Sequence, residues 1–413
     1  MCALLFTFVA LAAGFVDNVV LATESSKFDA CADDASCSYN GRCIAGECRC
    51  APEWHGTHCS RLRLLPASRI AGFRSPHVAD ARNISSWGGS VIQDAEGDGK
   101  WHMFASEMVN GCGIDYWEPN SQIVHAVADN AEGPYRFESV VLLPFAHEPN
   151  AVRAPTGEWV IYATVRHPPG VTVNCTHPVV PTKPQVPEPR HTYMVYANSP
   201  YGPWSSPVLV LKANYSLWDN QSVLVDTNLA VTITASGAAV GIWRKCENTR
   251  GTVCELTCCT FPHLLTATNW RDPATYVPQL DRQLFPGIHP YGAEDPMLWV
   301  APAPSDSGKS VIHAVLHDEQ GPARCTATGR HAFSDDGGSS WHYAAEDAYN
   351  GSVEWEDGSQ STLFRRERPH IITSLQGRPL AISNGVQEDT RSDRSWTLIQ
   401  PVAQLAHELT SYV

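Results

Sequence analysis

The sequence predicts an all-β protein in which a five-bladed β-propeller follows a small disulfide-rich module. From residue 78 onward, short runs rich in Val, Ile, Trp and Tyr alternate with Gly, Pro and Asn turns, and no long helical periodicity is present. Before that point, six of the fourteen cysteines of the 413-residue chain fall between residues 31 and 59. So short a segment cannot bury an adequate core, and disulfides must therefore hold it together.

A repeat of about seventy residues divides the segment 78–413. Similar second strands read KWHMFAS, EWVIYAT, AVGIWRK and SVIHAVLH, and each unit ends on a turn with an aromatic residue. These aromatics are Tyr135, Trp204, Trp270 and Trp341, at separations of 69, 66 and 71 residues, and a shorter fifth unit holds Trp396. A period of this length with about four strands favours propeller blades over a sandwich.

The N-terminus and the charge balance predict an exported protein. Residues 3–16 form a short apolar run followed by small residues, so we interpret residues 1–22 as a secretory signal peptide; a buried helix is the alternative. No later stretch reaches membrane-spanning length. The net charge of -14, without any basic run, argues against nucleic acid or an anionic membrane as a partner.

The cysteine spacing of residues 31–59 resembles an EGF-like module. That resemblance implies the pairing Cys31–Cys43, Cys37–Cys48 and Cys50–Cys59. A zinc site is the alternative use of clustered cysteines, but an oxidising compartment disfavours it. The module is a possible binding site for a protein partner, or a spacer.

Five Asn-X-Ser/Thr sequons fit an exported glycoprotein. They lie at Asn83, Asn174, Asn214, Asn220 and Asn350.

Three stretches of the predicted propeller place a polar pair directly before a proline. They are His147-Glu148-Pro149, Glu294-Asp295-Pro296 and Glu367-Arg368-Pro369. Because proline is tolerated at the first position of a strand and not in its middle, we expect each pair to precede an innermost strand. Aligning the units by their turns puts Trp87-Gly88-Gly89 and Thr227-Asn228-Leu229 at the same place in the other two blades. These residues are therefore predicted to surround one mouth of the central channel.

Loop cysteines occur at matching places in four blades. They are Cys112, Cys175, Cys246 and Cys325, with Cys254, Cys258 and Cys259 close by. We expect most of them to form disulfides that brace a rim around the mouth.

The blade pattern over residues 78–413, the turn SPYGPW and the entry Glu294-Asp295-Pro296 resemble the arabinanase, invertase and levansucrase group that includes glycoside hydrolase family 43. This resemblance implies cleavage of glycosidic bonds by channel carboxylates, without a cofactor. It makes Glu294 the general acid, with Asp295, Glu367 and Glu148 as further candidates. Where the family has acids in blades 1 and 3, this sequence has Gly88, Gly89 and Asn228; Asp219, or Asp115 and Glu118, could substitute.

Other side chains at the predicted mouth suit sugar binding. Trp87 and Trp117 are candidate stacking platforms, and His147 and Asn228 are candidate hydrogen-bonding partners. His147 and His317 could instead ligate a metal, but a hydrogen-bonded histidine is commoner, and we expect no metal site.

We therefore expect a secreted glycoside hydrolase that acts on a polysaccharide or glycan. One alternative is a glycan-binding propeller without hydrolytic chemistry, which the missing acids favour. The other is an extracellular adhesion or signalling protein that works through its EGF-like module. A propeller fold alone does not decide among them.

Overall fold

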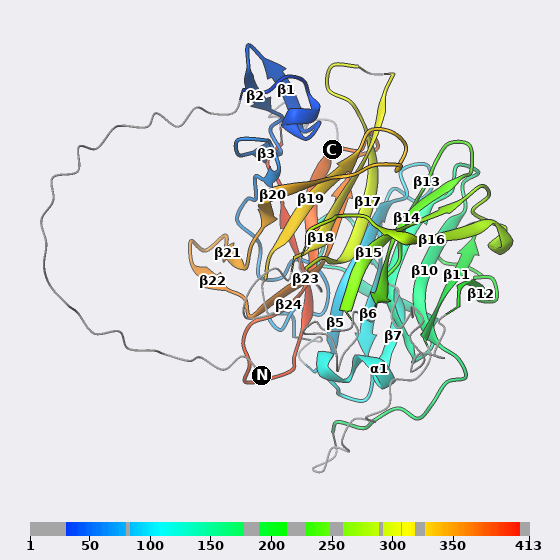
Figure 1. Ribbon diagram of the computed structural model, residues 1–413. Helices are drawn as coiled ribbons and strands as arrows, with labels where there is room; N and C mark the ends of the chain where they lie inside the picture. Colours follow the sequence, from blue (N-terminus) through cyan, green and yellow to red (C-terminus); the bar gives the residue numbers. More distant parts are fainter. Residues whose placement is uncertain are drawn as a thin grey trace, which may run out of the picture.

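The computed structural model describes residues 30–79, 83–176, 190–212, 228–247, 259–288, 292–306, 308–318 and 327–404. Figure 1 shows five antiparallel sheets grouped side by side, with a small module at one end. The innermost strands contact one another in order, from β5 to β9, β13, β17 and β23, and then back to β5. The predicted five-bladed propeller is confirmed.

Each blade is a meander in which consecutive strands pair. Blade 1 consists of β5 (Ser85–Gln93), β6 (Trp101–Met108), β7 (Ser121–Ala128) and β8 (Arg136–Leu142). Blade 2 consists of β9 (Ala146–Arg153), β10 (Trp159–Arg166), β11 (Arg190–Ala197) and β12 (Val208–Leu211). Blade 3 consists of β13 (Ala230–Ile233), β14 (Ala239–Glu247), β15 (Cys259–Ala267) and β16 (Tyr276–Gln283). Blade 4 consists of β17 (Glu294–Pro302), β18 (Ser310–His317), β19 (Gly329–Ser334) and β20 (His342–Tyr349).

Blade 5 has three strands of its own, β23 (Arg365–Thr373), β24 (Pro379–Gln387) and β25 (Trp396–Pro401). Its outer edge pairs with the chain that precedes blade 1, through antiparallel bridges from Leu64 to Val402 and from Phe73 to Thr397. The backbone N–H of Phe73 donates to the carbonyl of Thr397 over 2.9 Å, and the reverse bond measures 3.0 Å. The segment between the module and blade 1 thus covers the edge that would otherwise expose unpaired backbone groups.

The prolines of the polar-pair motifs lie inside the innermost strands. Pro149, Pro296 and Pro369 fall within β9, β17 and β23, so our expectation that each pair precedes its strand is wrong for these blades. The ladder shifts register at the same place in each strand, which is a β-bulge. A bulge leaves a residue out of the ladder, so the missing proline N–H breaks no regular bond there.

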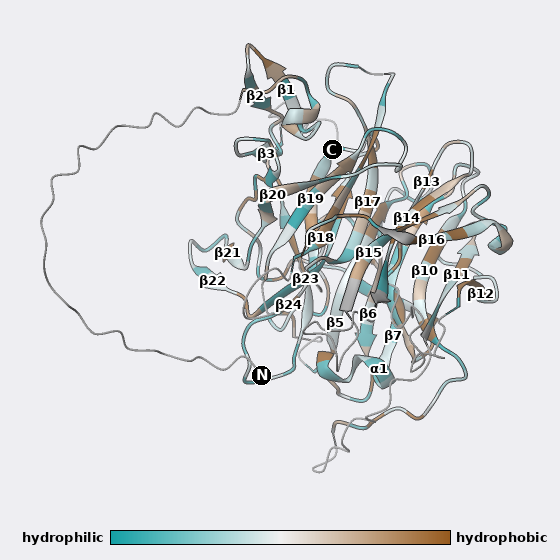
Figure 2. Ribbon diagram, in the orientation of Figure 1, coloured by the Kyte–Doolittle hydropathy of each residue, from teal (hydrophilic) through white to brown (hydrophobic). Residues whose placement is uncertain are grey.

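The strand interiors supply the hydrophobic core, and Figure 2 shows hydrophobic residues along the strands of the blades. Tryptophans fill the space between sheets, among them Trp159 and Trp243, which are fully buried. The turn SDDGGSSW at residues 334–341 is held by its own side chains, because Asp336 accepts bonds from the Ser340 N–H over 2.8 Å and from Ser334 Oγ over 2.9 Å.

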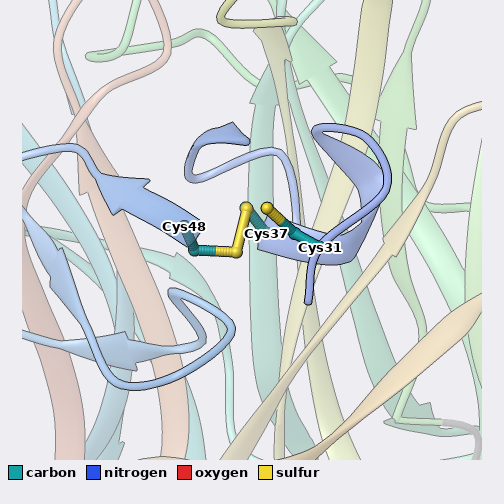
Figure 3. Close-up of side chains that lie close together, drawn as sticks. All are labelled: Cys31, Cys37 and Cys48. Atoms are coloured by element: carbon teal, nitrogen blue, oxygen red, sulfur yellow. A yellow bond between two sulfur atoms is a disulfide. The ribbon is translucent and has the colours of Figure 1, made fainter. Parts of the chain in front are cut away.

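The EGF-like module contains β1 (Gly41–Ile44), β2 (Glu47–Cys50) and β3 (Trp54–His55), and β3 pairs with β4 (Arg61–Leu62). Its disulfides are Cys31–Cys43, Cys37–Cys48 and Cys50–Cys59, as the resemblance implied. Figure 3 shows how close Cys31, Cys37 and Cys48 lie. Because all six thiols are consumed, the zinc alternative is excluded for this module.

The module packs tightly on the propeller. Trp54 is 2% exposed and its ring lies 5.0 Å from that of His331, in a cluster with Trp299 and Ile371 from blades 4 and 5. Polar contacts surround this core: Tyr39 Oη donates to Asp335 over 2.7 Å. The module and the propeller therefore share one hydrophobic core.

Buried histidine pairs sit within blades 1 and 4. His102 Nδ1 lies 2.9 Å from His125 Nε2, and His313 Nδ1 lies 3.0 Å from His331 Nε2. Burial lowers the pKa of His125 and of His313 to about 3. These imidazoles therefore stay neutral in the folded protein at pH values where they are protonated in the unfolded chain.

Several sequence predictions fall outside the described residues, namely the signal peptide, Asn214 and Asn220. Asn83, Asn174 and Asn350 are exposed, as a glycosylated asparagine must be, and their glycosylation stays a prediction. Among the described residues, no helix is long and apolar enough to cross a membrane.

We predict that Trp54→Ala will destabilise the whole chain by about 3–5 kcal/mol, the usual cost of deleting a buried Trp. Because the core is shared, calorimetry should record one cooperative transition at a lower temperature. The control is Ile44→Ala, which removes a side chain that is 48% exposed on the same module. A separate early transition of the module, with the propeller unaffected, would contradict the shared core.

We also predict that the free energy of unfolding falls as the pH drops from about 6.5 toward 4. In this window the histidines are protonated in the unfolded chain and remain neutral in the folded protein. The free energy of unfolding therefore falls by up to about 1.4 kcal/mol per pH unit for each buried histidine. Urea denaturation at several pH values measures the slope. His125→Phe should flatten it, whereas the exposed-site control His58→Phe should not. An unchanged slope in His125→Phe would refute the assignment.

Candidate functional site

One residue from each innermost-strand region forms a ring at the channel, which we call the central ring. Its members all have positive φ: Gly88 (61°), Glu148 (63°), Asn228 (38°), Asp295 (52°) and Arg368 (52°). Such values are uncommon for residues other than glycine, and here they recur at the residue before Pro, Gly or Leu in every blade. The repeated backbone twist brings all five residues to the lining of one small central cavity.

Arg368 is the hub of the central ring. Its Nη2 forms ion pairs with Glu148 Oε1 and with Asp295 Oδ1, the latter over 2.9 Å. Asp295 also accepts from Asn228 Nδ2 over 2.5 Å and from the Arg368 backbone N–H over 3.3 Å. Blades 2 and 4 are thus tied to blade 5 through one guanidinium group, and blade 3 joins them through the bond from Asn228 to Asp295.

Blade 1 contributes a glycine to the central ring, and its lack of a side chain leaves space for Arg368. A Cβ atom placed on Gly88 would lie 3.0 Å from Cβ and 3.3 Å from Cδ of Arg368. Glycine also adopts the required φ without strain. The glycine that replaces an expected acid therefore makes room for the arginine.

The ring separates the predicted catalytic acids into two groups. The side chains of Glu148 and Asp295 are 5% and 4% exposed and are bonded to Arg368. Glu294 and Glu367 precede the ring residues of blades 4 and 5, and their side chains are 13% and 21% exposed. The side chains of the second pair are therefore the more exposed of the two.

A second cavity, of about 140 Å³, lies above the ring, and we call it the mouth cavity. Its lining contains Trp87, Ile114, Trp117, His147, Glu148, Asn228, Arg244, Glu294, Asp295, Arg365, Glu367 and Arg368. The structure therefore brings together all eight residues predicted to be catalytic or substrate-binding. Of the possible substitutes for the missing acids, Asp219 lies outside the described residues, and Asp115 is paired with Arg365 over 3.6 Å.

Two basic side chains hold Glu294. Arg244 Nη1 forms an ion pair with Glu294 Oε2, and His317 Nδ1 lies 3.3 Å from Glu294 Oε1. Beside it, Glu367 lies 4.0 Å from Arg365 Nε, the limit of an ion pair. Each of these two partly exposed acids thus has a guanidinium neighbour.

Aromatic side chains also line the mouth cavity. Trp117 lies in α1 (Trp117–Asn120) and stacks on His147 with ring centres 4.7 Å apart. The side chain of Trp117 is partly exposed, whereas that of Trp87 is only 3% exposed. Trp117 is therefore the better placed of the two predicted sugar platforms.

The loop that carries Trp117 is braced by a disulfide between Cys112 and Cys175. Cys112 packs with Trp87 and Ile114, so this bridge lies on the same face as the mouth cavity, as predicted. The rest of the predicted rim is not described: Cys254, Cys258 and Cys325 lie outside the described residues, and the side chains of Cys246 and Cys259 are not placed.

One group at the mouth has the composition of a cation site. Ligand atoms of Glu294, Asp295 and His317 lie within 4.8 Å of one another. His147, the other histidine considered as a ligand, instead has its Nδ1 2.7 Å from Ser121 Oγ.

Sequence reasoning missed Arg244, and it placed Arg368 at the mouth without identifying its partners. Arg244 lies 50 residues before its partner Glu294, and Arg368 lies 220 residues after Glu148. The motif Glu367-Arg368-Pro369 did contain the signal for Arg368, since it alone places a cation at the ring position.

Comparison with known proteins supports this architecture. A family model described as "Teneurin-like EGF domain" matches residues 33–61. Among proteins with curated descriptions, none matches this chain in sequence.

Several solved structures share the propeller fold. One described as "Glycoside hydrolase" superposes with a TM-score of 0.51 and 11% identity, over 83% of this chain and 94% of its own. The α-L-arabinofuranosidase PaAbf62A from Podospora anserina, solved with cellotriose, gives a TM-score of 0.50 and 11% identity, over 84% and 96% of the two chains. A family 117 glycoside hydrolase from Zobellia galactanivorans gives 0.49 and 10%, over 83% and 90%. The chain is a five-bladed propeller with an EGF-like module, and the solved structures that share its fold include glycoside hydrolases.

We predict that Arg368→Met will destabilise the protein by about 3–5 kcal/mol, because Glu148 and Asp295 lose a buried partner. Arg365→Met, on the same strand but at the mouth, is the matched control and should cost under about 1 kcal/mol. Equal losses in the two variants, measured by urea denaturation, would contradict the hub role of Arg368.

Proposed function

We propose that the protein is a secreted glycoside hydrolase that cleaves a polysaccharide or glycan at the mouth cavity. The observation that carries this proposal is that two partly exposed acids, Glu294 and Glu367, line the same cavity as the partly exposed Trp117. Aromatic faces pack on the apolar faces of sugars, and carboxyl groups supply the acid–base chemistry. The proposal is also supported by the glycoside hydrolases among the solved structures that share this fold.

The proposed roles follow from what glycoside cleavage needs. One carboxyl group must protonate the leaving oxygen, and a second must act on the opposite face of the sugar, about 5–10 Å away. We assign Glu294 as the proton donor and Glu367 as the second carboxylate. They precede the ring positions of neighbouring blades, so they face the same cavity from two sides.

Glu148 and Asp295 receive a different role in this proposal. Both are bonded to Arg368 and nearly closed to solvent, so they shape the floor of the mouth cavity rather than react. Asn228 joins them through its bond to Asp295. His147 orients Trp117 by stacking beneath it.

The ion pair between Arg244 and Glu294 favours a second candidate function, glycan binding without hydrolysis. A guanidinium group favours the ionised form of a neighbouring carboxyl group, which opposes the role of proton donor. Hydrolysis therefore requires that the bound sugar draws Arg244 away from Glu294. In the binding-only alternative, Arg244 and Glu294 act together as fixed hydrogen-bonding partners for sugar hydroxyls.

Export is part of the proposal. Four disulfides are formed within the described residues, and such bridges persist in oxidising compartments. The EGF-like module could add a protein partner through the surface that it does not use against the propeller.

We predict that Glu294→Gln will lower turnover by roughly a hundredfold or more, the usual scale for losing a positioned acid. The wild type is first screened on arabinan, fructan and xylan by release of reducing ends, and the variant is then compared on any substrate cleaved. Glu138→Gln, at an exposed site on β8, is the matched control and should leave turnover unchanged.

Unchanged turnover in Glu294→Gln would exclude this residue as the acid. Sugar binding by calorimetry without cleavage of any of the substrates would replace hydrolysis by the binding-only function.

A further inference from the structure

A large groove separates the EGF-like module from the outer strand of blade 4. It has a volume of about 630 Å³, which is within the range of ligand sites. One wall comes from the end of the module and the segment after it, at His55, Arg61 and Leu64; the other comes from β20 and the hairpin of β21 and β22 (Gln360–Thr362). This junction groove runs along β20, and its Asn350 end lies at the same end of blade 4 as Glu294, because Glu294 pairs with His317, His317 with Gly329, and Gly329 with Tyr349.

Asn350 lines the junction groove and begins the sequon Asn350-Gly351-Ser352. Its side chain is exposed, and its Oδ1 accepts from the Ser352 N–H over 3.0 Å. Within the described part of the chain, Nδ2, the atom that carries an N-linked sugar, makes no hydrogen bond. The attachment point is also rigid, because the fully buried Arg366 donates from Nη1 to the Asn350 carbonyl over 3.0 Å.

The groove walls offer hydrogen-bonding groups of every kind. Arg61 supplies donors, Glu354 supplies acceptors, and Gln360 supplies both; all three are exposed. Glu354 and Gln360 lie directly opposite each other in the β21–β22 ladder, so their side chains point to the same face. Groups of this mixture suit a hydroxyl-rich ligand and disfavour an apolar one.

We propose that Asn350 carries an N-linked glycan whose inner sugars lie in the junction groove, bonded to Arg61, Glu354 and Gln360. The glycan then bridges the segment after the EGF-like module to blade 4, alongside the shared hydrophobic core. This inference needs export through a glycosylating pathway, but it is independent of any activity at the mouth.

The test uses the full chain secreted from a eukaryotic host. Site-resolved mass spectrometry follows the release of each glycan by an amidase, first on the folded protein and then on denatured protein. The exposed Asn174 provides the internal control. We expect the Asn350 glycan to leave the folded protein at least tenfold more slowly than the Asn174 glycan, and both to leave denatured protein at similar rates.

Variants distinguish a glycan that is bound in the junction groove from one whose attachment site is simply hard for the amidase to reach. Arg61→Ala combined with Gln360→Ala should speed release at Asn350 and leave Asn174 unchanged, whereas Arg42→Ala, on exposed β1, should alter neither. Ser352→Thr keeps the sequon and should keep the slow release. An unmodified Asn350 in both the wild type and Ser352→Thr, equal release rates in the folded protein, or no effect of the double variant would each overturn the proposal.

Discussion

The ion pairs of Arg368 with Glu148 and Asp295 are the constraint on which the channel depends. Charged groups this far from solvent are costly unless they are paired, and breaking such a pair leaves a charge without compensation. Each blade therefore has to present its ring residue at one point, which it does through a bulge or turn with positive φ. Gly88 supplies the room that the arginine needs. The ring thus links the backbone geometry of all five blades to the charge balance at the centre.

Two other features follow from this centre. Above it, the residues that precede the ring positions, such as Glu294, Glu367 and His147, are left to line an open cavity. The EGF-like module lies at the other end of the blades and shares a hydrophobic core with blades 4 and 5, and the segment that follows it runs along the outer edge of blade 5. The module therefore belongs to the propeller structurally, while the mouth remains clear of it. A ligand at the mouth and a contact on the module can be accommodated at the same time.

The sequence was sufficient to predict the five blades and the equivalence of the five motif positions. The EGF-like resemblance added the pairing of the six cysteines in the module. These depend on local patterns: a regular period, a cysteine spacing and a repeated proline. The sequence did not separate Glu148 and Asp295, which are tied to Arg368, from Glu294 and Glu367, which face the cavity. That division depends on partners far apart in the chain and on a bulge that turns adjacent side chains in different directions. The prolines inside β9, β17 and β23 were misplaced for the same reason, since a bulge is not visible in a one-dimensional pattern.

The central claim is that Glu294 and Glu367, the partly exposed acids of the mouth, act on a sugar, whereas the central ring is structural. A crystal structure of the Glu294→Gln variant with a bound arabino- or xylo-oligosaccharide tests it most directly. The account predicts a sugar ring beside Trp117, its glycosidic oxygen within about 3.2 Å of the side chain at position 294, and Arg368 still bonded to Glu148 and Asp295. A sugar that displaces those two acids from Arg368, or that binds away from the mouth, would contradict it.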